Sequence, residues 1–245
     1  MSLKSVRLIM GMPVELQVLD AVATQRDLED VFEYFLAVDS RFSTYKLNSE
    51  ISKINRGEIL PADYSLEVQQ IFSLSERTKT ETEGYFNIQT PDKKFDPSGI
   101  VKGWAVYNAS LMLEKKGFRN FYIEAGGDIQ TAYEGNRFWR VGVKNPFGGK
   151  EFVKVLNLQN HGVATSGNYI RGAHIYNPHN VKDDLGGLAS VTVVAENVYE
   201  ADRFATALFA MGEYGIEFAR KKALAAFFIT SEKKTIFTEK FTNYV

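Results

Sequence analysis

The sequence predicts one α+β domain that spans residues 1–245. Three observations favour this class. The length of 245 residues allows a sizeable buried core, and the hydrophobic content of 44% is that of ordinary globular proteins. Helical patterns gather in the first half and short strands in the second, which disfavours a doubly wound βαβ fold. No proline- or serine-rich linker divides the chain.

The first predicted element is a strand or a hairpin over residues 6–19. Val14, Leu16 and Val18 alternate with polar residues, which is the period of a half-buried strand. Pro13 would lie at a strand start or edge. Thr24 then opens a helix, because Thr24 and Asp27 have capping-box spacing. The apolar stripe of this helix consists of Leu28, Val31, Phe32, Phe35 and Leu36.

Three further helices are predicted before the middle of the chain. Ser49 is expected to cap a short helix over residues 50–55, because serine is a favoured N-cap. A longer helix is expected over residues 66–82, and Gly84 ends that region. The third is expected over residues 102–116, closed by Gly117 at the position after its C-terminus.

Short strands dominate the second half, separated by Gly, Asn and Pro turns. They are expected at residues 121–123, 129–133, 139–143, 153–158, 163–165 and 190–195. Two helices follow, at residues 200–211 and 216–222. Residues 226–230 and 235–238 are expected to form a closing hairpin.

Composition excludes several functions. Lys and Arg number 29 against 30 Asp and Glu, a balance that argues against nucleic-acid binding. The absence of cysteine excludes disulfides, thiol catalysis and cysteine-bound metals, and 3 histidines disfavour a His-rich metal site. A metal would therefore be a hard cation on oxygen ligands. No apolar run is long enough for a membrane span, and the first residues, which enter an alternating stretch almost at once, do not have the apolar run typical of a signal segment. The chain as written is expected in the cytoplasm, or outside it if a signal segment was removed.

Two glycine-rich segments could approach a ligand. In residues 99–103, a turn bracketed by Gly99 and Gly103 feeds a helix, whose free N–H groups suit a phosphate, and Lys102 adds a cation. Gly126 and Gly127 allow the backbone to come close to a ligand. The structural alternatives are an ordinary loop-to-helix junction and a plain tight turn.

Two further segments offer oxygen ligands. Asp202 and Thr206 are four residues apart on a predicted helix, hence on one face, and could bind Mg²⁺. Thr165 and Ser166 could contact phosphate or sugar oxygens. The alternatives are first-turn electrostatics for Asp202 and locally satisfied hydroxyls for the others. His174 stands alone in an apparent strand, where a histidine is more often structural than catalytic.

In this order, the segments resemble the ApbE family of flavin transferases. The matching blocks cover residues 10–13, 43–45, 49–55, 99–103, 126–128, 165–167, 174–178 and 201–212. They run through nearly the whole chain. The resemblance implies a T-fold-like architecture, with a mixed or antiparallel sheet and packed helices.

The resemblance also implies a reaction. The family binds FAD and, with Mg²⁺, moves the FMN moiety to a Thr or Ser hydroxyl of an acceptor flavoprotein, releasing AMP. Phosphoryl transfer needs positioning and charge neutralisation, which suits a chain without thiols. Two alternatives stay open. One is an FAD pyrophosphatase that gives FMN and AMP, since the family's longer stretch is reduced here to residues near 91–95. The other is a non-catalytic FAD-binding protein.

By the same resemblance, Asp202 and Thr206 would hold Mg²⁺ together with the backbone carbonyl of Val101. Tyr45 would stack on the isoalloxazine ring, and His174 would deprotonate the acceptor hydroxyl. His174, Asp202 and Lys102 are thus the expected catalytic residues. The nucleotide is expected against Met10, Tyr45, Lys102, Gly126, Gly127, Asp128, Thr165, Ser166 and Gly167.

Overall fold

The main sheet confirms the predicted α+β class. The computed structural model describes residues 2–149, 151–167, 175–180, 185 and 187–245. Within these residues an antiparallel sheet of eight strands runs in the order β1-β2-β3-β4-β7-β8-β9-β10. Its strands are β1 (Leu3–Ile9), β2 (Met12–Val18), β3 (Phe121–Ala125), β4 (Asp128–Ala132), β7 (Gly162–Gly167), β8 (Leu188–Ala195), β9 (Ala225–Thr230) and β10 (Thr235–Phe237).

The first two strands form the predicted hairpin. Leu3 pairs with Val18, and Ile9 pairs with Met12. Met10 and Gly11 make the turn with φ angles of 56° and 70°, the left-handed conformation that a two-residue hairpin turn requires. The alternate residues Val14, Leu16 and Val18 are fully buried, as the period-2 pattern predicts.

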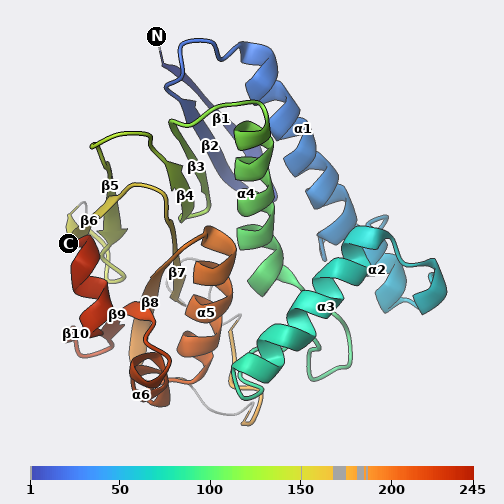
Figure 1. Cartoon of the computed structure of the whole chain (residues 1–245). Helices are drawn as coiled ribbons and strands as arrows, with labels where there is room; N and C mark the ends of the chain where they lie inside the picture. The colour runs from blue at the N-terminus through green and yellow to red at the C-terminus, as the bar shows by residue number, and fades with distance from the viewer. Residues whose placement is uncertain (1, 150, 168–174, 181–184, 186) are drawn as a thin grey trace.

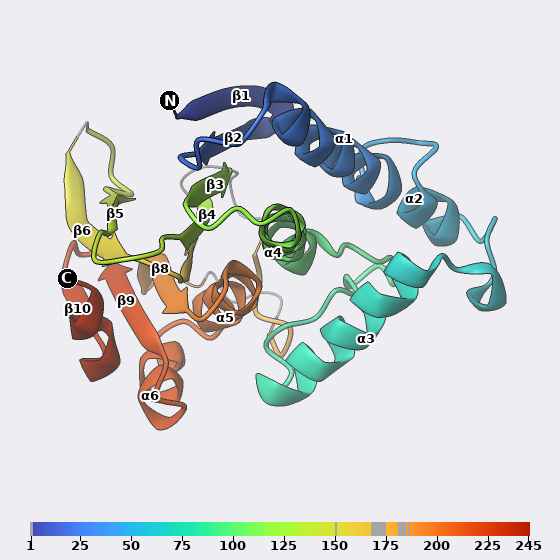
Figure 2. The same ribbon diagram turned by 45° about the horizontal axis from the view of Figure 1, so that its top comes forward.

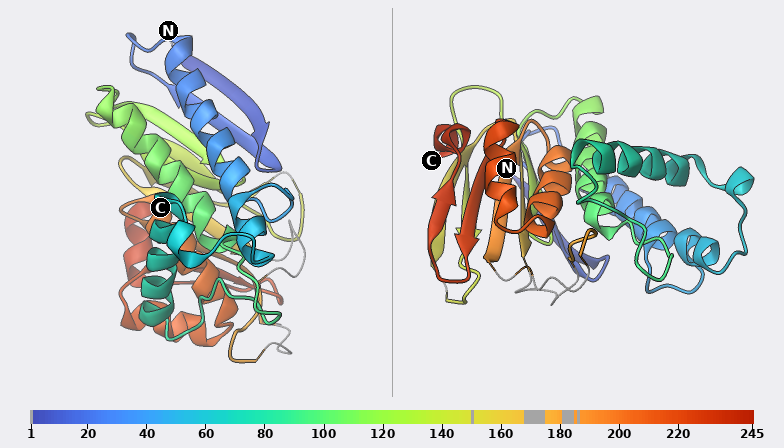
Figure 3. Two further views of the ribbon diagram at one scale, coloured as in Figure 1. Left: turned by 90° about the vertical axis from the view of Figure 1, so that its right-hand side faces the viewer. Right: turned by 90° about the horizontal axis from the view of Figure 1, so that it is seen from below.

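Three helices cover one face of the sheet: α1 (Gln25–Phe42), α4 (Ser98–Lys115) and α5 (Val198–Ala210) (Figure 1). In Figure 2, α4 and α5 lie side by side against the sheet, and α3 (Leu66–Glu81) lies outside them. The view from below in Figure 3 shows the same succession of layers. Two shorter helices complete this part, α2 (Glu50–Asn55) and α6 (Tyr214–Lys221). None of the helices in the described ranges is long and apolar enough to cross a bilayer.

The capping box predicted at the start of α1 is confirmed. The backbone N–H of Thr24 donates to Asp27 Oδ2 at 2.9 Å, and the side chain of Thr24 accepts from the N–H of Asp27. Below it, Leu28, Val31, Phe32 and Phe35 are fully buried. Leu36 departs from the expected stripe and is 48% exposed, because it lies at the margin of the buried face.

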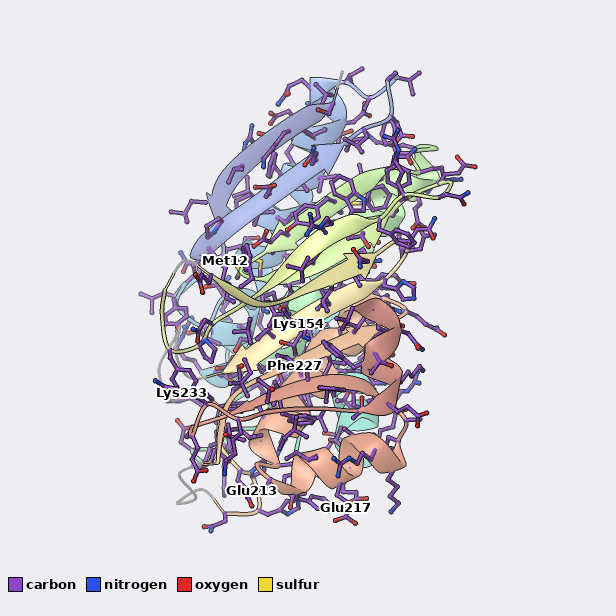
Figure 4. The ribbon with its side chains drawn as sticks, turned by 90° about the vertical axis from the view of Figure 1, so that its left-hand side faces the viewer. Met12, Lys154, Glu213, Glu217, Phe227 and Lys233 are labelled. Atoms are coloured by element: carbon purple, nitrogen blue, oxygen red, sulfur yellow. The ribbon has the colours of Figure 1, made fainter. Side chains whose placement is uncertain are left out.

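A smaller layer covers part of the opposite face. The strands β5 (Trp139–Lys144) and β6 (Phe152–Leu158) form a separate two-stranded sheet. Together with the 3₁₀ helix η2 (Glu239–Tyr244), this sheet closes a second core around Leu156, Phe227 and Phe241. The rings of Phe227 and Phe241 stack with their centroids 5.3 Å apart. Figure 4 shows this face, with Lys154 on the outer strand β6 and Met12 at the end of the first hairpin.

One predicted boundary is wrong in a way that matters for the site. Helix α4 begins at Ser98, four residues before the expected start, so Gly99, expected in the preceding turn, lies within the helix together with Gly103. A Cβ on Gly103 would lie 2.5 Å from Asp202 Cβ and 2.9 Å from the carbonyl oxygen of Val198. Gly103 therefore allows α4 and α5 to approach closely; it does not form a loop.

Candidate functional site

A cleft opens where the first turns of α4 meet the middle of α5 and the ends of β3 and β7. Its empty space, including the open mouth, is about 1050 Å³. Seven of the expected catalytic, nucleotide-binding and metal-binding residues line it, from four separate segments. They are Lys102, Gly126, Thr165, Ser166, Gly167, Asp202 and Thr206.

A buried charge cluster lies at the cleft. The Lys102 ammonium is paired with Asp128 and lies 3.6 Å from Asp202 Oδ1; the three side chains are 13%, 0% and 4% exposed. The N–H of Gly103 donates to Asp202 Oδ2 at 2.8 Å, and this bond joins α4 to α5. Two carboxyl groups thus share one ammonium in a nearly dry place.

The environment of Asp128 is unusual for a buried carboxylate. Burial and then the neighbouring Asp202 carboxylate raise the pKa of Asp128, and Lys102 opposes this shift. Its Oδ1 atom is buried and accepts no hydrogen bond from any described residue. Buried polar atoms without a partner are rare and need an explanation such as an ion, a water molecule or a ligand.

The hydroxyl groups of the cleft divide into two kinds. Ser166 Oγ lies 3.3 Å from Thr206 Oγ1, and both side chains face the cleft. Thr165 Oγ1 lies 2.9 Å from Thr192 Oγ1, so this hydroxyl is already used between β7 and β8. Asp202 and Thr206 line the cleft together, which confirms the predicted common face on α5.

The start of α4 offers fewer free N–H groups than the sequence suggests. The amide of Ser98 donates to Asp96 Oδ1 at 3.0 Å. The amides of Ile100 and Val101 donate to the carbonyl of Pro97 at 3.0 and 2.9 Å. These donors are satisfied within the chain, so a phosphate would depend more on Lys102 and the hydroxyls than on the helix terminus.

The orientation of α5 depends on Arg203, which the sequence reasoning does not identify. The Arg203 side chain is 3% exposed, its Nη1 lies 2.5 Å from Glu81 Oε2 on α3, and Nη2 pairs with Glu200. The guanidinium also lies 4.2 Å from the ring centre of Phe204. Arg203 is the one basic residue of this helix, beside Glu200 and Asp202, and its position in a largely apolar run was the available signal.

The sequence reasoning includes only part of the apolar lining of the cleft, through the matching block 174–178. Phe86, Ile88, Ile175, Tyr176 and Pro178 make this part of the lining largely apolar, with Asn87, Thr90 and Asp96 among its polar members. Tyr176 Oη donates to the carbonyl of Gln89 at 3.3 Å. The sequence signal for this lining was the aromatic residue Tyr176 close to Pro178, within the matching block 174–178. A cleft with both apolar and charged lining suits a ligand with a flat ring and a phosphate group.

The remaining predicted residues lie elsewhere. Gly126 and Gly127 form the β3–β4 turn with φ angles of 58° and 95°; Gly126 lines the cleft, whereas Gly127 does not. Met10, Tyr45 and Val101 are not among the described residues that line the cleft. Tyr45 is 96% exposed between α1 and α2, and Val101 is buried in α4. Their expected roles stay predictions, and His174 lies outside the described residues.

Two curated relatives of this chain carry the same name. The FAD:protein FMN transferase of Escherichia coli K12 is 29% identical over 160 residues, covering 60% of this chain and 46% of that protein. The chain thus spans about half the length of this curated relative. The FAD:protein FMN transferase of Haemophilus influenzae is 24% identical over 272 residues, covering 84% of this chain and 79% of that protein.

Solved structures agree in fold. The flavin transferase ApbE of Vibrio cholerae superposes with a TM-score of 0.86 at 20% identity, covering 100% of this chain and 99% of that one. The ApbE protein of Thermotoga maritima gives the same TM-score, identity and coverage. The family model described as the ApbE family matches residues 10–92 and 89–228. This chain therefore belongs to the ApbE family.

Proposed function

We propose that this chain transfers the FMN moiety of FAD to a Thr or Ser hydroxyl of an acceptor flavoprotein, in a Mg²⁺-dependent reaction that releases AMP. The observation that carries the proposal is one cleft lined by Lys102, Asp202, Ser166 and Thr206, with Asp128 buried behind it and paired with Lys102. The names of the curated relatives, FAD:protein FMN transferase, support the same reaction.

The charge of the cluster supports a divalent cation. A pyrophosphate in the cleft would be repelled by the Asp202 carboxylate unless a cation lay between them. The donor set fits Mg²⁺: a carboxylate and hydroxyls are hard oxygen ligands, and the orphaned Asp128 Oδ1 can accept from a metal-bound water. No three acidic or histidine side chains gather in the described part of the chain, but Mg²⁺ commonly takes one or two carboxylates plus phosphate and water.

We assign Mg²⁺ to Asp202 and Thr206, with the carbonyl of Val101 as a further ligand. When bound, Mg²⁺ neutralises charge on the pyrophosphate and fixes its orientation. Lys102 would contribute a second positive charge, held in place by Asp128. Ser166 would donate a hydrogen bond to a phosphate oxygen, and the apolar wall around Phe86 and Tyr176 would pack against a ring of the nucleotide.

The proposed transfer forms one bond and breaks one bond at phosphorus. The acceptor hydroxyl oxygen forms a bond to the FMN phosphorus, and the bridging P–O bond of the pyrophosphate breaks. AMP leaves with the bridging oxygen, and the hydroxyl proton passes to a base, for which we propose His174. Most of the catalytic effect would then come from positioning and charge neutralisation.

The test is incubation of the purified chain with FAD, Mg²⁺ and a candidate acceptor protein, followed by mass spectrometry. An acceptor mass increase equal to FMN supports the transferase. Free FMN and AMP without acceptor modification would instead identify a pyrophosphatase. Tight FAD binding with neither product would identify a non-catalytic flavin-binding protein.

A variant pair tests the metal assignment. Asp202→Asn keeps the shape of the side chain and removes its charge, so Mg²⁺-dependent turnover should fall at least about 100-fold. The stabilisation of the folded chain by Mg²⁺ in a thermal melt should also disappear. Asp63→Asn on the exposed 3₁₀ turn η1 (Pro61–Asp63) is the matched control and should behave as the wild type. Full Mg²⁺-dependent activity in Asp202→Asn would refute the assignment.

A further inference from the structure

Helix α2 is short, but both of its ends are fixed. At its start, Ser49 Oγ accepts from the N–H of Ser52 at 3.1 Å and donates to the carbonyl of Ser43 at 2.6 Å. After its last residue, Asn55, the amides of Gly57 and Glu58 turn back to the carbonyls of Ile54 and Lys53, both at 2.9 Å. Ile51 and Ile54 are buried. The helix therefore presents Asn55 from a rigid support.

Asn55 makes two hydrogen bonds to one residue that is 40 positions later in the chain. Its Nδ2 atom donates to the carbonyl of Phe95 at 2.9 Å. The N–H of Phe95 donates to Asn55 Oδ1 at 2.8 Å. A side-chain amide thus offers Phe95 the donor and acceptor that a neighbouring β-strand would offer. Because both bonds must form at once, they fix the position of Phe95 along the chain direction.

Phe95 belongs to a small hairpin, residues 87–96, that forms part of the cleft wall. On its other side, Phe95 bridges to Gln89, and the N–H of Asp96 donates to the carbonyl of Ile88 at 2.8 Å. Asp96 Oδ1 in turn accepts from the amide and the hydroxyl of Ser98, the first residue of α4, at 3.0 and 2.6 Å. The hairpin therefore connects α2 to the helix that carries Lys102.

The hairpin residues Asn87, Ile88, Thr90 and Asp96 all line the cleft. The ring of Phe95 packs on Phe72 of α3 with centroids 4.7 Å apart, but an apolar contact of this kind is not directional. The paired bonds from Asn55, in contrast, are directional and fix the register of Phe95. Displacement of Phe95 would move Asp96 and the first turn of α4 with it.

We propose that Asn55 is a positioning residue, which holds the 87–96 hairpin as the wall of the cleft through its two bonds to Phe95. It touches neither the charge cluster nor the hydroxyls, and it acts through the hairpin. For the nature of the ligand this inference rests on the proposed function, because FAD is the molecule whose binding it is expected to control.

The experiment compares three variants of the full chain. Asn55→Leu keeps the side-chain volume and removes both bonds, and Asn55→Gln keeps the amide on a longer stem. The matched control is Asn160→Leu, because Asn160 Oδ1 accepts from the N–H of Tyr133 at 2.8 Å beyond the far end of β4. Two quantities are measured: hydrogen exchange of the Phe95 and Asp96 amides, and the dissociation constant for FAD with Mg²⁺ present.

Asn55→Leu should speed exchange of these two amides about 10-fold or more, the equivalent of losing about 1.4 kcal/mol of local stability. It should also weaken FAD binding by about 10-fold. Asn55→Gln should restore part of both effects, and Asn160→Leu should leave both within about 2-fold of the wild type. A common thermal midpoint across the variants would show that the changes are local.

Three results would overturn the proposal. The first is unchanged exchange in Asn55→Leu, which would show that packing alone orders the hairpin. The second is faster exchange with unchanged FAD affinity, which would make the clamp purely structural. The third is an equal loss of affinity in Asn160→Leu. If the wild type binds no FAD, the proposed function fails, and the exchange pattern still decides whether Asn55 orders the hairpin.

Discussion

Gly103→Ala should both destabilise the fold and disturb the cleft. The added Cβ would lie 2.5 Å from Asp202 Cβ, about 1 Å closer than carbon atoms normally approach, so α4 and α5 must separate. Overpacking of this kind costs about 1–3 kcal/mol. Weakening the bond from the Gly103 N–H to Asp202 costs about 1.5–3 kcal/mol more, because its acceptor is charged. The higher helix propensity of alanine offsets about 1 kcal/mol of this loss in stability.

The net loss in the free energy of unfolding is therefore about 1.5–5 kcal/mol, which corresponds to a fall of about 3–20 °C in the thermal midpoint. Urea unfolding measures the first quantity and calorimetry the second. Fluorescence titration with FAD then reports on the cleft, where affinity should fall because Asp202 is displaced.

The matched control is Gly215→Ala. A Cβ on Gly215 would lie 2.5 Å from the carbonyl oxygen of Leu208, which is again on α5 but belongs to the contact with α6. This variant should lose comparable stability and retain FAD affinity below its melting temperature. Stability of Gly103→Ala within about 0.5 kcal/mol of the wild type would refute the close-approach argument. Equal affinity losses in both variants would refute its connection to Asp202.

Two further predictions concern charges. Arg203→Met should lower the free energy of unfolding by about 2 kcal/mol, which urea unfolding measures. This loss is smaller than for a fully buried pair because Glu81 and Glu200 are 33% and 27% exposed. The control Arg26→Met, on a side chain that is 70% exposed, should change the free energy of unfolding by under about 0.5 kcal/mol. Hydrogen bonds from Lys116 and then Thr24 lower the pKa of Asp27 to about 2. Because the folded-state pKa is depressed, this stabilisation is present above about pH 4 and lost as the pH falls through 2. Asp27→Asn should therefore be about 1 kcal/mol less stable than the wild type at pH 7, and a difference that persisted undiminished at pH 2 would contradict the assignment.

Local patterns predicted the elements whose cause is local. The alternation of Val14, Leu16 and Val18 depends only on neighbouring residues, and so does the capping box of Thr24 and Asp27; both are present. The common face of Asp202 and Thr206 follows from helical spacing alone, so the sequence was sufficient to bring these two side chains together.

Features that depend on distant partners were not predictable in this way. Gly103 looks like a loop residue because glycine disfavours helices, and only the approach of α5 explains it. The bonds from Asn55 to Phe95 span 40 residues, and the pair of Arg203 with Glu81 spans 122. No periodicity within a window of one helix or strand contains such pairs. The site was thus predictable as a set of segments but not as a set of contacts.

The buried cluster also indicates that this cleft is a functional site. Three ionisable side chains are buried together here, those of Lys102, Asp128 and Asp202. Apolar side chains of similar volume at these positions would destabilise the fold less. One ammonium there faces two carboxyl groups. Packing does not account for a buried ionisable cluster that lowers stability, whereas a site that binds a cation requires oxygen ligands of this kind. By the same argument, replacing Asp128 and Lys102 together with Asn and Met should cost less stability than replacing Lys102 alone, because the single variant leaves two unpaired carboxylates. A double-mutant cycle in urea measures this coupling, and strict additivity of the two changes would refute it.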